Sequence, residues 1–126
     1  MENYTNEKTL LRIYINENDR YGDKALSEAL VNMFKNEGYP GATVFKCIAG
    51  FWDQSGSRDG DYQDDKKQLP VIVELIAGRG RVNLIMPRIT KMMASGMITM
   101  ATVKVARKRR ISTLTGIFQE LTTSIH

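Results

Sequence analysis

The chain has 126 residues, of which 42% are hydrophobic and 25% charged, and it carries a formal net charge of +4. This length suits one domain that buries roughly two-thirds of its unfolded surface, so a core can form without a disulfide or a structural metal. A single cysteine and a single histidine exclude a disulfide framework, a zinc site and a histidine-based catalytic triad.

The first half of the chain predicts a strand, a helix and a second strand. Residues 10–15 form a short apolar run that is typical of a central strand. From Lys24 onward apolar residues recur at steps of three and four, and Gly38 followed by Pro40 ends this helical pattern. Residues 43–51 are rich in β-branched and aromatic side chains, which predicts a strand that ends in a glycine and large aromatics.

The second half repeats the pattern of strand, helix and strand. Residues 69–76 predict a third strand, and residues 81–94 predict a second helix with one apolar stripe. Pro87 fits such a helix if the first turn begins near residues 84–86, where a missing N–H costs least. Residues 98–105 alternate in polarity and predict the last strand.

This order of elements predicts an α+β fold, the ferredoxin-like βαββαβ sandwich, in which two helices cover one face of an antiparallel sheet. The other face stays uncovered, and its apolar side chains predict a homo-oligomer. We expect one domain over residues 1–110. Residues 111–126 form a C-terminal extension, in which Ser112 is placed to cap a short helix.

Residues 53–68 form a polar connection between the second and third strands. The segment is too long for an ordinary hairpin, and such loops in small domains are usually functional or disordered. Its aspartates do not match the spacing of a calcium-binding loop, so we expect no metal there.

Basic residues gather in two places. The run Lys104 to Arg110 suits phosphate binding, but charges on an edge strand also prevent aggregation, and both interpretations stay open. No aromatic residues alternate with these cations, so we expect no nucleic-acid partner. Residues 78–81, Gly-Arg-Gly-Arg, are a weak candidate for an anion site at the start of the second helix.

Two motifs carry a resemblance to a known family. GATVFKCIAGF at residues 41–51 and LPVIVELI at residues 69–76, with the long polar loop between them, resemble the PII signalling superfamily and more closely its PII-like branch. The resemblance spans about residues 9–108. It implies a homotrimer that binds an adenine nucleotide between subunits. It also implies that the long loop is a T-loop, which docks on a regulated partner such as a membrane transporter.

The resemblance also implies which residues contact the nucleotide. They lie on the second strand, at the base of the loop and on the last strand: Thr43, Phe45, Lys46, Gly50, Phe51, Trp52, Thr99, Met100, Lys104 and Arg107. The glycine- and lysine-bearing phosphate loop of PII proteins is absent at residues 97–102, which favours AMP or ADP over ATP.

The sequence leaves other functions open. A scaffold that binds a protein partner without nucleotide is one, and a metal-dependent nucleotide hydrolase that uses the loop aspartates is another. No catalytic constellation is evident, so we expect a protein that is not an enzyme. The single Cys47 and an acidic N-terminal segment with no apolar run behind it predict a cytoplasmic protein.

Overall fold

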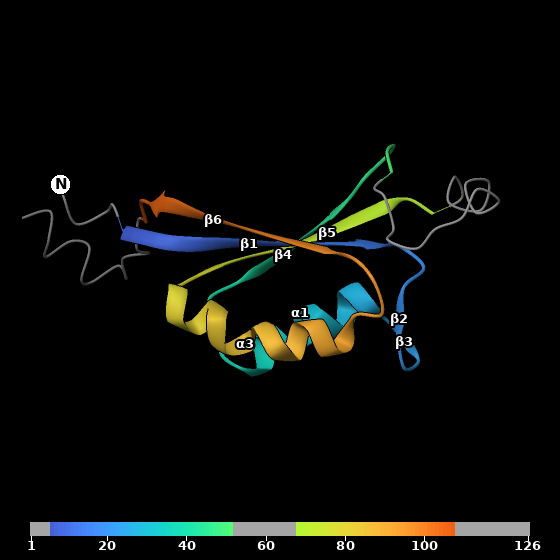
Figure 1. Cartoon of the computed structure of the whole chain (residues 1–126), viewed down its shortest axis with the longest axis horizontal. Coiled ribbons are helices and arrows are strands. Elements are labelled where there is room, and N and C mark those ends of the chain that lie inside the picture. The colour runs from blue at the N-terminus through green and yellow to red at the C-terminus, as the bar shows by residue number, and fades with distance from the viewer. Residues whose placement is uncertain (1–5, 52–67, 108–126) are drawn as a thin grey trace, which may run out of the picture.

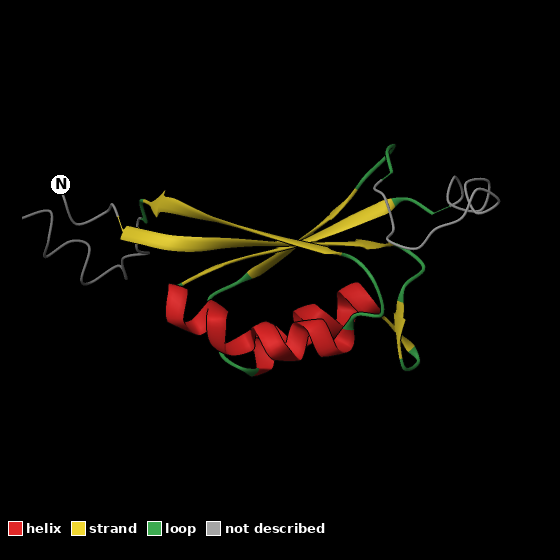
Figure 2. Cartoon of the chain, in the orientation of Figure 1, coloured by secondary structure: helices red, strands yellow, loops and turns green. Residues whose placement is uncertain are grey.

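The computed structural model describes residues 6–51 and 68–107, which form an antiparallel sheet with helices on one face (Figures 1 and 2). The sheet strands are β1 (Asn6–Asn16), β4 (Ala42–Lys46), β5 (Pro70–Ala77) and β6 (Met97–Val105). The helices are α1 (Leu26–Asn36) and α3 (Arg79–Met92). The strand order β4-β5-β1-β6, with every neighbouring pair antiparallel, confirms the ferredoxin-like fold. The predicted helix after Ser112 lies outside the described residues, as do residues 52–67 of the loop.

The core lies between the sheet and the helices. Residues that face each other across antiparallel strands share one face of the sheet. On β1 and β5 the core residues are Leu11, Ile13, Ile15, Val71, Val73, Leu75 and Ala77. The helices add Leu26, Leu30, Met33, Phe34, Val82, Ile85 and Ile89. This alternation along β1 and β5 explains why the strands could be recognised from their period-two pattern.

The opposite face of the sheet carries apolar side chains. Both described helices lie on the other face, as Figure 2 shows, so neither of them covers these side chains. Tyr14 on β1 stands opposite Ile72, and Ile72 stands opposite Phe45 on edge strand β4. Leu10 stands opposite Ile76 in the same way. Phe45 is 47% exposed and Ile76 is 38% exposed. The prediction of an uncovered apolar face is therefore confirmed for the residues that the structure describes.

Two element boundaries differ from prediction. The second strand, β4, ends at Lys46 and not at Phe51, and the Cys47 N–H donates a 3.1 Å hydrogen bond to Pro70 O just beyond the strand. Lys24 belongs to a short hairpin that the sequence did not predict, and α1 starts at Leu26. This hairpin pairs β2 (Arg20–Tyr21) with β3 (Lys24–Ala25). Two-residue strands have no periodicity from which to recognise them.

The second helix predicted at residues 81–94 is present as α3, but the start near residues 84–86 that would suit Pro87 is not observed. Helix α3 begins at Arg79, and Pro87 lies inside it. A proline at this position leaves the carbonyl four residues earlier without its N–H partner. Asn83 and Pro87 both lie on the exposed side of α3, where solvent can satisfy that carbonyl, so the helix continues.

The turn between α3 and β6 depends on a glycine. Gly96 has φ of +141°, and a Cβ there would lie 2.7 Å from Tyr14 O and 2.5 Å from the Met93 Cε. We expect Gly96→Ala to lower the free energy of unfolding by about 2 to 4 kcal/mol, through backbone strain and overpacking. Urea denaturation measures this loss. Gly80→Ala is the control, because a Cβ on Gly80 meets open space inside α3 and should be neutral or stabilising. Equal stability of the two variants would contradict the close approach at Gly96.

Neither α1 nor α3, the helices of the described residues, has the length and apolar character needed to cross a membrane.

Candidate functional site

A hollow of about 750 Å³ lies at one end of the sheet, where β1 and β4 begin and β5 and β6 end. The N-terminal turn of α3 forms part of its wall. Five elements or their flanks contribute polar and large apolar side chains to its lining, among them Lys8, Thr43, Glu74, Ile76, Arg81 and Arg107. The backbone of Gly41 and Gly78 also borders the hollow, without side chains to fill it.

The hollow has an excess of positive charge. Its lining contains the cations Lys8, Arg81 and Arg107, and among the described lining residues Glu74 is the one carboxylate. Arg12 Nε donates a 2.9 Å hydrogen bond to Glu74 Oε2, so this carboxylate is already paired by a cation on the neighbouring strand. This hydrogen bond raises the pKa of Arg12 above its ordinary value, and the guanidinium stays charged. The remaining cations attract an anion.

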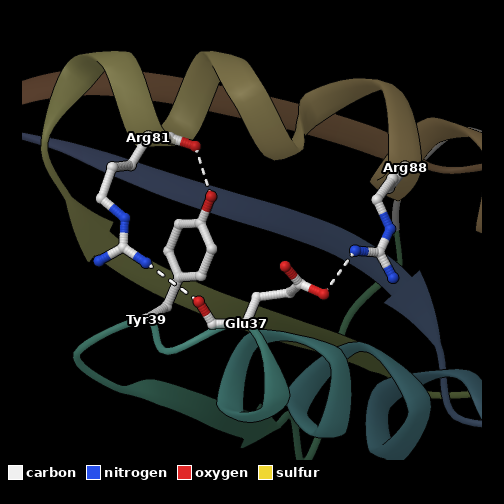
Figure 3. Close-up of polar contacts among 4 residues, drawn as sticks. All are labelled: Glu37, Tyr39, Arg81 and Arg88. Atoms are coloured by element: carbon white, nitrogen blue, oxygen red, sulfur yellow. Dashed lines mark hydrogen bonds and ion pairs between the residues drawn. The ribbon is translucent and has the colours of Figure 1, made fainter.

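Arg81 is held by the turn that leads from α1 into β4 (Figure 3). Its guanidinium carbon lies 4.0 Å from the ring centroid of Tyr39, and its Nη2 donates a 3.2 Å hydrogen bond to Glu37 O. The Tyr39 hydroxyl donates a 2.7 Å hydrogen bond to Arg81 O. Phe34 packs edge-on against Tyr39, with ring centroids 6.0 Å apart. The arrangement therefore links Arg81 to the hydrophobic core.

Of the residues implied by the resemblance, the structure brings Thr43 and Arg107 together in the hollow. Lys104 is exposed on β6, where the strand register places it opposite Glu7 of β1. Thr99 and Met100 are adjacent on β6 and lie on opposite faces of the sheet, because their partners are Arg12 and Leu11.

The other implied residues follow Thr43 along β4 and into the segment after it. Phe45 and Lys46 end β4, and Gly50 and Phe51 follow them toward the base of the long loop. Gly50 has φ of +129°, which glycine adopts without strain, and the Phe51 side chain is 83% exposed. Trp52 lies outside the described residues. Arg107 and Gly50 therefore lie toward opposite ends of the sheet (Figure 1), whereas Thr43 and Thr99 lie between them in one row of paired strands.

Sequence reasoning did not include Lys8, Glu74, Ile76 and Arg81 among the ligand-contacting residues. A weak signal existed for Arg81, because residues 78–81 are a weak candidate for an anion site at the start of the second helix. Lys8 and Glu74 had no local signal. They reach the hollow only through the pairing of β1 with β5 and β6.

The described residues form a ferredoxin-like domain with a hollow lined by cations at one end of its sheet and an apolar sheet face that no described element covers. The chain belongs to the DUF190 family, described as Uncharacterized ACR, COG1993, whose model matches residues 8–105. It is 32% identical over 99 residues to a UPF0166 protein of Aquifex aeolicus, with 79% of this chain and 93% of that protein covered. It is 30% identical over 80 residues to a UPF0166 protein of Methanocaldococcus jannaschii, with 64% of this chain and 73% of that protein covered. The family is PII-like, which confirms the coarser part of the resemblance seen in the sequence.

Proposed function

We propose that this protein is a PII-like regulator that binds an adenine nucleotide, AMP or ADP rather than ATP, in clefts between the subunits of a homotrimer. Bound nucleotide changes the conformation of the loop at residues 53–68, and the loop regulates a partner protein such as a membrane transporter. The proposal is of a cytoplasmic binding protein and not of an enzyme. The observation that carries it is the cationic hollow whose lining includes both Thr43 and Arg107.

The chemistry of the hollow suits a nucleotide. Arg107 and Lys8 supply fixed positive charge for phosphate oxygens. Ile76 supplies an apolar wall for a base, and the Thr43 hydroxyl and Glu74 carboxylate, opposite each other on β4 and β5, supply polar contacts at its edge. A small number of polar groups around an apolar wall is the usual composition of such sites.

The separation of the implied residues supports a site shared between subunits. Strand β6 has nine residues, so its ends lie roughly 26 Å apart at about 3.3 Å per residue. Arg107 follows one end of β6, and Gly50 lies beyond the end of β4 at the opposite end of the sheet, so one chain cannot bring these two residues to the same ligand. If the end of one chain meets the opposite end of the next, the interface is heterologous, and a rotation that closes produces a ring. The uncovered apolar face provides the surface on which such chains pack.

The base of the long loop is well placed to respond to ligand. Glu17 N–H donates to Leu69 O at 3.0 Å, and Leu69 N–H donates to Glu17 Oε1 at 3.2 Å, which fixes the return of the loop into β5. On the outgoing side Ile48 is 96% exposed and Phe51 is 83% exposed. These apolar side chains offer contacts to a partner protein or a neighbouring subunit. A ligand shifts the loop only by its difference in affinity for the two loop states.

Calorimetry with AMP, ADP, ATP and cyclic AMP on the purified chain tests the proposal. We expect saturable binding of AMP or ADP, weaker binding of ATP, and a loss of affinity of about 10-fold or more in Arg107→Gln, because a charged hydrogen bond is removed. Lys91→Gln removes an exposed cation at the other end of α3 and is the matched control. Hydrogen exchange across residues 50–68, with and without nucleotide, reads the response of the loop.

The outcomes separate the candidate functions. Absence of binding by all four adenylates would overturn the proposal in favour of a scaffold that binds its partner without nucleotide. Release of inorganic phosphate in the presence of magnesium or manganese would contradict the non-enzymatic part. If the Arg107→Gln and Lys91→Gln variants bind nucleotide with equal affinity, the nucleotide does not bind in the hollow.

A further inference from the structure

We propose that Arg81 is an anion-binding residue of the hollow, held in its binding conformation by Tyr39, and that it contacts a phosphate group. The inference deepens the proposed function and rests on it for the identity of the nucleotide, but not for the binding of phosphate. Arg81 contacts the anion, and Tyr39 is a positioning residue that acts through Arg81.

The guanidinium of Arg81 has donors to spare. Arginine carries five N–H donors, and within residues 6–51 and 68–107 its side chain makes one hydrogen bond, from Nη2 to Glu37 O. Figure 3 shows the other terminal nitrogen directed away from the labelled residues. Because Arg81 also borders the hollow, the remaining donors are available to a ligand there.

Arg81 is preorganised from two sides. The Tyr39 ring lies under the guanidinium at 4.0 Å, and Glu37 O fixes one of its nitrogens. Such contacts hold the long side chain in one conformation, so less rotamer freedom is lost when an anion binds. Arg107, by contrast, follows the end of β6, and its side chain makes no hydrogen bond or ion pair to another described residue.

The charges around Arg81 favour the binding of an anion. Lys8 and Arg107 border the same hollow, while Glu74 is paired with Arg12. Like charges in one hollow repel, and a phosphate placed between them relieves the repulsion through charge-assisted hydrogen bonds. A phosphate also matches the fork geometry of the guanidinium.

The test measures binding of inorganic phosphate, pyrophosphate and AMP to the full chain by calorimetry at two salt concentrations. Arg81→Gln is expected to weaken all three by between about 10-fold and about 100-fold, and to flatten the dependence on salt. Arg88→Gln is the matched control, because Arg88 lies on the same helix and pairs with Glu37 at 2.9 Å but does not border the hollow. It should bind like the natural chain.

Tyr39 has its own pair of variants. Tyr39→Phe keeps the ring beneath the guanidinium and should retain most of the affinity, whereas Tyr39→Leu removes the ring and should lose several-fold. Thermal unfolding of each variant identifies any that fail to fold, and Arg81→Lys provides a folded substitute that keeps the charge but loses the fork.

Each outcome distinguishes the inference from the proposed function. AMP binding that is unchanged in Arg81→Gln and Arg81→Lys overturns the inference and leaves the function standing. If phosphate or pyrophosphate binding depends on Arg81 and AMP binds no more tightly, the result supports the inference and overturns the proposal that the ligand is a nucleotide. Absence of binding by all three anions overturns both.

Discussion

Replacing Ile72 by glutamate is expected to leave this protein as single chains, whereas the natural chain is expected to form trimers. Ile72 lies in the middle of the uncovered face, between Tyr14 of β1 and Phe45 of β4. A carboxylate at this position would have to be buried without a partner, which costs on the order of 3 kcal/mol or more. Size-exclusion chromatography with light scattering measures the mass of the particle.

The control for this change is Leu84→Glu. Leu84 is a large apolar residue that is 77% exposed on α3, on the side of the molecule that carries the helices. A glutamate there adds the same charge without entering the uncovered face, so the mass should not change. If the natural chain is already a monomer in dilute solution, the proposals of a trimer and of clefts shared between subunits are wrong.

Replacing Phe34 by alanine is expected to lower the free energy of unfolding by about 3 to 5 kcal/mol, as for other large core residues. Phe34 is 1% exposed on α1 and packs edge-on against Tyr39. Its loss creates a cavity and removes the support for the ring beneath Arg81. Because the stability of an oligomer depends on concentration, urea denaturation is compared at one fixed protein concentration.

Phe45→Ala is the matched control for Phe34→Ala. The same atoms are removed, but Phe45 lies on the uncovered face and is half exposed in the single chain. Its loss should change the folding of one chain by less than about 1 kcal/mol and weaken the association between chains. Similar losses in both variants at a concentration where the chains are dissociated would contradict the assignment of the core to the helix-covered face.

Most of the fold could be predicted from the chain itself. Apolar residues on the core face of β5 alternate with polar or half-buried ones, and those of α1 recur at helical steps, because each element buries one face. Predictions failed where a local rule competed with the surroundings. The second helix was predicted at residues 81–94, with a start near residues 84–86 only if Pro87 had to lie in the first turn. Because Pro87 lies on the exposed side of α3, the helix begins at Arg79 and continues past the proline.

Less of the candidate site could be predicted. The resemblance selected Thr43 and Arg107, which both line the hollow. Lys8 and Arg81 were not selected, since a single lysine at a strand start and an arginine in a helix are ordinary surface residues in any sequence. Their proximity depends on strand pairing over long separations.

The sequence by itself determined the kind, number and order of the main elements, and the presence of apolar side chains on both faces of the sheet. These are local properties, because periodicity within one segment decides which side of it is buried. Only the tertiary structure decided which charges share a hollow and which implied residues lie at opposite ends. Register between β1, β5 and β6 brings Lys8, Glu74 and Arg107 together, and no segment of the chain contains that register on its own.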